Sequence, residues 1–137
     1  MGARGAAAAL VAKLALGLRN DGRGIAAHPS IAVELLGRRM SVHNVQDAEL
    51  ARRPIFTPPG HPTIYRFSAA GSEAAHPGRT LQAAVIDVMF PLEGELDDLR
   101  VLYWIDCDGA HDSGQVVVPS VALSRFRDPS FRDTFVF

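Results

Sequence analysis

The sequence predicts an α+β fold, in which N-terminal helices are followed by a four-stranded antiparallel sheet. Apolar residues recur at helical spacing in the first part of the chain, whereas β-favouring residues are concentrated after residue 62. A chain of 137 residues with 47% hydrophobic content is long enough for one core. We therefore expect an N-terminal amphipathic helix or extension at 1–22 and a single compact α+β domain at 23–137.

The first predicted helix runs from about residue 5 to residue 19. Leu10, Leu14 and Leu18 stand at i, i+4 and i+8, and Gly22 follows as a stop signal. The first twenty residues hold no acid, three bases and many alanines, a composition that is also typical of organelle-targeting presequences. The segment is thus interpreted as a packing helix, with a targeting signal as the alternative.

Two shorter helices are predicted before residue 54. The second helix begins near Pro29, a residue suited to a first helical position, and its apolar face comprises Ile31, Leu35, Leu36 and Met40. The third begins after Asn44, whose side chain is suited to capping, and Pro54 ends it.

A proline-rich connector at 53–62 separates the predicted helices from the sheet. The predicted strands lie at 63–69, 80–90, 99–107 and 115–118. Pro119 ends the last strand, and one helical turn is expected between Ser120 and Asp128.

Charge is distributed unevenly along the chain. Residues 1–82 hold ten Arg or Lys and five Asp or Glu, whereas residues 83–118 hold one and eight. The net charge of −1 disfavours a dedicated nucleic-acid-binding protein. The single cysteine, Cys107, excludes an intramolecular disulfide and favours a reducing compartment, either cytoplasm or organelle matrix. Because no apolar run approaches ~20 residues, we expect no transmembrane segment and a soluble protein.

The densest group of potential metal ligands lies between the last two predicted strands. It comprises Asp106, Asp108, His111 and Asp112. A calcium-binding loop would require a bidentate glutamate at its twelfth position, where this chain has Val117. Because Asp, Gly and Ser are also favoured in hairpin turns, we expect a plain hairpin here, with a metal site as the alternative. No cofactor is predicted.

The chain has no P-loop, no G-x-S-x-G elbow and no paired zinc-ligand motif, which favours a protein that is not an enzyme. The alternative is a small-molecule enzyme or binder with an apolar pocket on a curved sheet. The pocket would be lined by Tyr65, Asp87, Tyr103 and Trp104. Asp87 would be the general base, because an apolar strand environment raises a carboxyl pKa. The opposite interpretation places Asp87 on an outer face or in a pair with Arg66 or Arg100.

The leading hypothesis is a non-catalytic accessory or assembly subunit that contacts protein neighbours in a larger complex, such as an organelle complex or a viral or phage particle. Its predicted partner-binding residues are Arg38, Arg39, Arg52, Arg53, Phe135 and Phe137. A further alternative is an inhibitor or immunity-type protein that blocks a basic partner with the acidic loops 93–98 and 106–112. The oligomeric state does not follow from the sequence.

Overall fold

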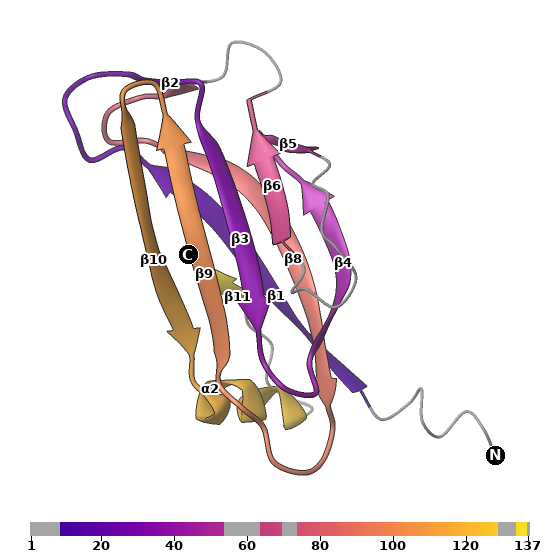
Figure 1. Cartoon of the computed structure of the whole chain (residues 1–137). Coiled ribbons are helices and arrows are strands. Elements are labelled where there is room, and N and C mark those ends of the chain that lie inside the picture. The colour runs from indigo at the N-terminus through magenta and orange to yellow at the C-terminus, as the bar shows by residue number, and fades with distance from the viewer. Residues whose placement is uncertain (1–8, 54–63, 70–73, 129–133, 137) are drawn as a thin grey trace.

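The computed structural model describes residues 9–53, 64–69, 74–128 and 134–136. They form two β-sheets that pack face to face, and the only α-helix among these residues is five residues long (Figure 1). The predicted α+β fold with N-terminal helices is therefore wrong. The predicted connector at 53–62 lies, except for Arg53, outside the described residues.

The first sheet has four strands in the order β11-β1-β8-β4. Their bounds are β1 Ala9–Arg19, β4 Ser41–Asp47, β8 Thr80–Pro91 and β11 Thr134–Val136. β8 is antiparallel to both of its neighbours, whereas the short β11 pairs with β1 in parallel.

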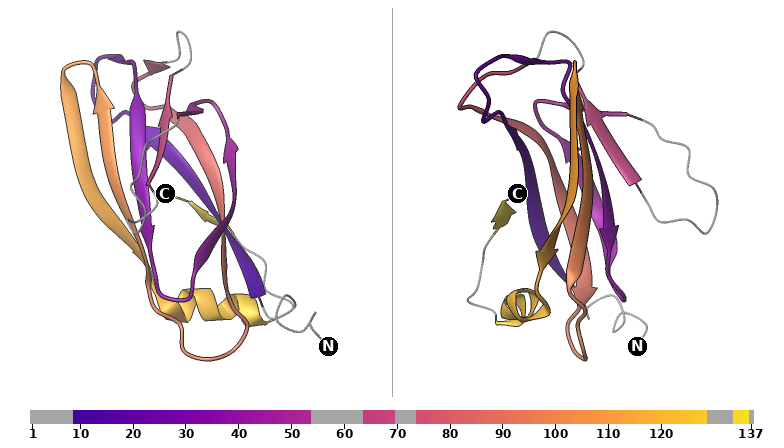
Figure 2. Two further views of the ribbon diagram at one scale, coloured as in Figure 1. Left: turned by 45° about the vertical axis from the view of Figure 1, so that its right-hand side comes forward. Right: turned by 60° about the vertical axis from the view of Figure 1, so that its left-hand side comes forward.

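The second sheet has five antiparallel strands in the order β10-β9-β3-β6-β5. Their bounds are β3 Ser30–Leu36, β5 Ala51–Arg53, β6 Ile64–Ser68, β9 Leu99–Cys107 and β10 Ala110–Val118. Figure 2 shows the two sheets as separate layers. Three predicted strands lie within one residue of β6, β8 and β9, whereas the fourth, 115–118, covers only the last part of β10. The four strands belong to two sheets rather than to one.

Both ends of the sandwich are covered by small elements. At one end lies a two-stranded ribbon of β2 (Ala26–Ala27) and β7 (Ala74–Ala75). At the other end lie α2 (Ser120–Ser124) and the 3₁₀ turn η1 (Arg125–Arg127), which confirm the helical turn predicted after Pro119 (Figure 1). Arg127 joins this end to the β8–β9 loop by donating hydrogen bonds to the carbonyl oxygens of Pro91 and Gly94.

The amphipathic helix predicted within 1–22 is a strand where the structure describes it. In β1, Ala12, Leu14, Leu16 and Leu18 are all buried, and the residues between them are more exposed. A four-residue spacing of leucines satisfies the period of a strand as well as that of a helix. The alternation that includes Leu16 decides for the strand, because a helix would turn Leu16 away from Leu14.

The second and third predicted helices are also strands. In β3, Ile31 and Val33 are buried and Leu35 is partly buried, which is a period of two. In β4, the register against β8 shifts between Val42 and Asn44. This bulge gives Val42 and Val45, three residues apart, the same partly buried environment, and a three-residue spacing resembles a helical one.

The hydrophobic core lies between the sheets. It contains side chains from the long central strands of both, together with Leu123 and Phe126 from the end cap. The rings of Phe90 and Phe126 meet edge to face with centroids 6.1 Å apart, which joins β8 to η1. The long strands therefore provide a rigid frame for the surfaces at their edges.

Candidate functional site: a free sheet edge beside an apolar slot

β10 is the edge strand of the five-stranded sheet. All nine of its residues are in register with β9, from Ala110 opposite Cys107 to Val118 opposite Leu99, with no shift. Within the described part of the chain, no strand pairs with its other side. A long, regular edge of this kind exposes a row of backbone N–H and C=O groups that can pair with another strand.

The other edge strands of the two larger sheets are short or irregular, although β11 covers only Lys13–Ala15 of the longer β1. β5 and β11 have three residues each, and β4 contains the bulge after Val42. Short strands and bulges are the usual devices that prevent edge-to-edge pairing. β10 has neither device, nor does it contain Lys or Pro.

The backbone groups that face outward from β10 can be assigned by alternation. The two-residue turn Asp108–Gly109 joins β9 to β10, with Gly109 at φ 79°. In an antiparallel pair, alternate residues direct both backbone groups away from the partner strand. Counting from the turn, these are His111, Ser113, Gln115 and Val117. The Ser113 N–H accordingly donates to Asp112 Oδ1, at 2.8 Å, rather than to β9.

An apolar slot opens between the two sheets beside β10. Its volume is about 200 Å³. It is lined by Leu16, Gly17, Ile31, Val33, Val101, Tyr103, Ile105 and Val116. β1, β3, β9 and β10 all contribute, so the slot and the edge belong to the same corner of the sandwich. A strand added to β10 would direct every second side chain toward this slot.

Tyr103 reaches across the inner face of β10 at Gly114. A Cβ atom at position 114 would stand 2.7 Å from the Tyr103 hydroxyl oxygen, closer than van der Waals contact allows. Gly114 therefore gives the ring its space, and the ring forms one wall of the slot. The sequence hypothesis placed Tyr65, Asp87, Tyr103 and Trp104 around one pocket, but of these four residues only Tyr103 lines the slot.

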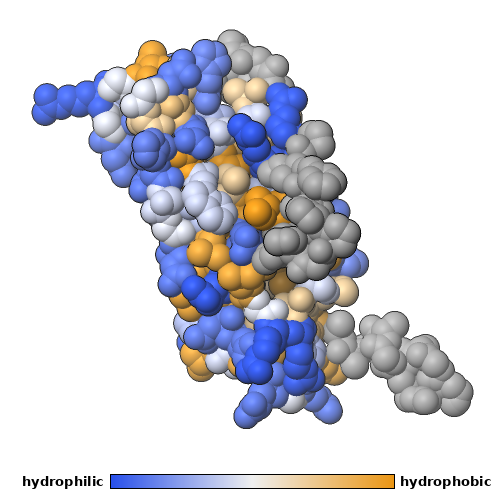
Figure 3. All heavy atoms as spheres, viewed as in Figure 1, coloured by the Kyte–Doolittle hydropathy of each residue, from blue (hydrophilic) through white to orange (hydrophobic). Residues whose placement is uncertain are grey.

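The outer face next to the edge is also partly apolar. Trp104 and Val117 are 40% and 43% exposed and point to the same side of the sheet. Figure 3 shows hydrophobic side chains gathered across the middle of this face and hydrophilic ones toward its two ends.

The four residues of the predicted metal site do not converge. Asp108 pairs with His28, whose Nδ1 lies 2.7 Å from Asp108 Oδ2. His111 stands opposite Asp106 on one face of the hairpin, whereas Asp112 faces the other side, opposite Ile105. No group of three His, Cys, Asp or Glu side chains among the described residues is arranged to hold a metal ion. The turn is instead a plain hairpin with an acidic end.

Asp87 and Tyr103, the catalytic candidates of the alternative pocket hypothesis, are also separated. Asp87 lies on β8 opposite Lys13 of β1, and its Oδ1 is 3.2 Å from the Lys13 Nζ. Its neighbours Ile86 and Val88 point into the core, so Asp87 faces outward from the four-stranded sheet. Tyr103 points inward from the other sheet. Asp87 is therefore paired on an outer face, as the opposite interpretation expected, although its partner is Lys13.

Arg38 and Arg39 lie in the β3–β4 turn and bind the β8–β9 loop. Arg38 Nε lies 2.7 Å from Asp97 Oδ2, and the Arg39 guanidinium donates to the Glu95 carbonyl oxygen. The hydrogen bond from Arg38 holds the pKa of the Asp97 carboxyl below its usual value and raises the pKa of Arg38. The basic front and acidic middle of the chain thus pair within the molecule, as Lys13 and Asp87 also do.

Arg52 and Arg53 lie on β5, at the far edge of the five-stranded sheet from β10. The Arg52 guanidinium lies 5.0 Å from the centroid of the Tyr65 ring, and Arg53 donates to Ser68 Oγ and the Ala69 carbonyl oxygen. The backbone of Phe135 is opposite Leu14 in β11, and Phe137 lies outside the described residues. The predicted partner-binding residues therefore do not form one surface.

The chain matches no protein-family model, no curated protein and no solved structure. In the described ranges, α2 and η1 have five and three residues, and neither is long and apolar enough to span a membrane. Sequence reasoning missed the free edge and the slot, and the signal was the two-residue turn Asp108–Gly109, after which β10 begins at Ala110.

Proposed function

We propose that this protein is a non-catalytic docking domain, in which β10 receives an extended strand from a partner protein in a larger assembly. The observation that carries this proposal is the nine-residue, unshifted edge beside an apolar slot. In strand addition, main-chain hydrogen bonds supply affinity, and pockets for alternate side chains supply specificity. The β10 edge offers the first and the slot offers the second.

The charges beside β10 favour a partner strand with a basic residue at one end. Asp106, Asp108 and Asp112 are gathered at the hairpin, whereas Val116, Val117 and Val118 occupy the other end of the strand. A complementary segment would place Lys or Arg near Asp112 and a large apolar side chain in the slot beside Val116. The partner class is thus an extended, basic and apolar segment of a protein.

Pairing between two copies of β10 is less favourable than binding such a segment. An antiparallel pairing centred on Gly114 would bring Asp112 of each copy opposite Val116 of the other. The Asp112 carboxylate, which has no cationic partner among the described residues, would then lie against the apolar slot, which is costly. A different chain is therefore the favoured occupant of the edge.

The alternative of an inhibitor with two acidic loops requires a large footprint. The loops 93–98 and 106–112 lie at opposite ends of β9 (Figure 1). Nine residues of strand separate them by roughly 30 Å, at ~3.3 Å per residue. We therefore propose that the acidic hairpin contacts the strand that docks on β10, and that it does not form a joint surface with loop 93–98.

The proposal is tested with a displayed library of random linear peptides selected against the full chain. We expect selected sequences to alternate apolar and polar residues and to carry a basic residue at one end. Gln115→Pro removes an outward N–H, and we expect it to weaken binding about tenfold or more. Gln115→Ala is the matched control, because it keeps that N–H, and its affinity should equal that of the wild type.

Circular dichroism and urea unfolding would establish that Gln115→Pro remains folded, as proline is tolerated on edge strands. Strand addition at β10 would be contradicted if peptides bind Gln115→Pro with wild-type affinity, or if Gln115→Ala weakens binding as much as Gln115→Pro does. If the protein forms a dimer that Gln115→Pro dissociates, the β10 edge instead mediates self-association.

A further inference from the structure

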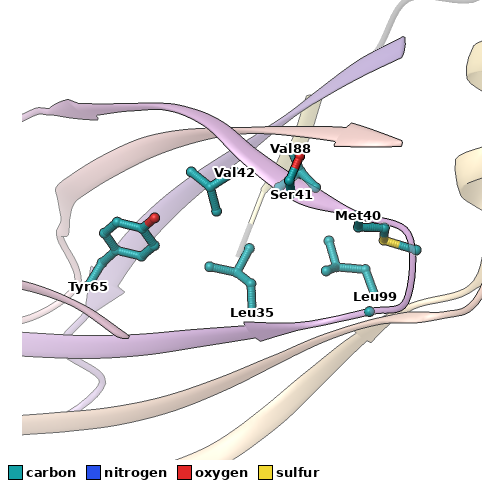
Figure 4. Close-up of a pocket in the computed structure, with 8 residues that line it drawn as sticks. Leu35, Met40, Ser41, Val42, Tyr65, Val88 and Leu99 are labelled. Carbon is teal, nitrogen blue, oxygen red and sulfur yellow. The ribbon is translucent and has the colours of Figure 1, made fainter. Parts of the chain in front are cut away.

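A second cavity lies between the sheets on the side of β4 and β6. Its volume is about 360 Å³, within the range of ~300–1,000 Å³ that is typical of small-molecule sites. It is lined by Leu35, Gly37, Met40, Ser41, Val42, Tyr65, Val88 and Leu99 (Figure 4). None of these residues lines the slot beside β10, so the two sites are separate.

The lining combines an apolar body with a polar side. Leu35, Val42 and Leu99 gather around the space, and Tyr65 directs its hydroxyl group toward Val42 (Figure 4). The hydroxyl groups of Ser41 and Tyr65 make no hydrogen bond within the described ranges of the chain. No acidic or basic side chain is among the described residues that line the cavity. The cavity thus suits an apolar ligand that carries one polar group.

A guanidinium group lies next to the cavity. The Arg52 guanidinium lies over the face of the Tyr65 ring, 5.0 Å from its centroid. None of the ion pairs among the described residues includes Arg52, and the Asp47 carboxylate accepts a hydrogen bond from the Arg52 backbone N–H. Arginine held against an aromatic ring is pre-organised to bind a carboxylate.

We propose that this cavity binds a small amphiphile with an apolar chain and a terminal carboxylate. The chain would lie among the leucine and valine side chains between β3 and β4. The carboxylate would lie at Tyr65 and Arg52, where a hydroxyl donor and a guanidinium are both available. This function is distinct from strand docking, because it uses a different side of the sandwich.

The test compares three probes with the same apolar chain by titration calorimetry: decanoate, decanol and decyltrimethylammonium. We expect decanoate to bind about tenfold more tightly than decanol, and the cation to bind least. Arg52→Ala should reduce the affinity for decanoate to that for decanol, while leaving decanol binding unchanged. Arg53→Ala is the matched control, because Arg53 binds Ser68 and Ala69, and it should leave all three affinities unchanged.

The position of the ligand is tested by methyl NMR. Met40 lines the cavity and Met89 does not, so decanoate should shift the Met40 methyl signal and leave that of Met89 in place. Val42→Phe fills the cavity and should weaken decanoate and decanol alike. Equal affinities for the three probes, an absence of binding, or equal losses in Arg52→Ala and Arg53→Ala would overturn the proposal.

Discussion

The stability of Leu16→Ala distinguishes a strand from a helix in the N-terminal segment of the chain. Leu16 is 2% exposed in β1 and contacts the core, whereas on a helix it would be rotated roughly 200° from Leu14 and would face away from it. Removing three buried carbons costs about 2.4 kcal/mol at ~0.8 kcal/mol each, and any cavity left behind adds to this. Because the slot already borders Leu16, the surroundings are partly open. We expect a loss of about 2–3 kcal/mol in the free energy of unfolding.

The assay is urea unfolding followed by the fluorescence of Trp104, the single tryptophan of the chain. Val11→Ala is the control, because Val11 lies on the opposite face of β1 from Leu16 and is 40% exposed. It should lose less than about 1 kcal/mol. If both variants lose the same amount, or if Leu16→Ala loses nothing, β1 does not alternate as the fold requires.

Three further outcomes follow from the described contacts. Gly114→Ala should destabilise the protein by about 1–3 kcal/mol, because the new Cβ would meet the Tyr103 hydroxyl. In a double-mutant cycle followed by urea unfolding, Gly114→Ala should cost less in the Tyr103→Phe background than in the wild type. At pH values above the ordinary carboxyl pKa of 3.8, Asp97→Asn should be slightly less stable than the wild type. This difference should vanish as pH falls through the lowered pKa of Asp97, because the wild type then also loses the pair with Arg38. A difference that grows in acid would refute this. Asp87→Asn should change the free energy of unfolding by less than about 1 kcal/mol, because its partner Lys13 is 54% exposed, and a larger loss would show that the pair is structural.

Several strands could be predicted from the sequence because their residue types favour a strand and do not also fit a helix. The segment 99–107 contains β-branched and aromatic residues and coincides with β9, and 80–90 matches β8 to within one residue. The Asp-Gly turn after β9 is likewise a strong local signal. Local chemistry decides these elements, so no knowledge of the partner strands is needed.

The N-terminal strands could not be predicted by the same reasoning, because their spacing is ambiguous. Leu10, Leu14 and Leu18 fit both periods, and the bulge in β4 gives Val42 and Val45 a helical separation. Burial against β8 decides these segments, and that contact is long-range in the sequence.

The candidate site could be predicted only in part. The sequence indicates a hairpin with an acidic turn and a tyrosine in an apolar setting, and both are present at the β10 corner. That β10 is an edge strand, and that Leu16 from β1 closes the slot beside it, depend on the order of strands in two sheets. Strand order follows from packing among distant segments, which no local pattern contains.

Amide hydrogen exchange along β10, with and without a peptide selected on the protein, tests the docking edge most directly. In the protein alone, we expect slow exchange at Gly114 and Val116, which face β9, and fast exchange at Gln115 and Val117, which face outward. With peptide bound, Gln115 and Val117 should become protected as well. Unchanged exchange at these two amides in the complex would contradict strand addition at β10.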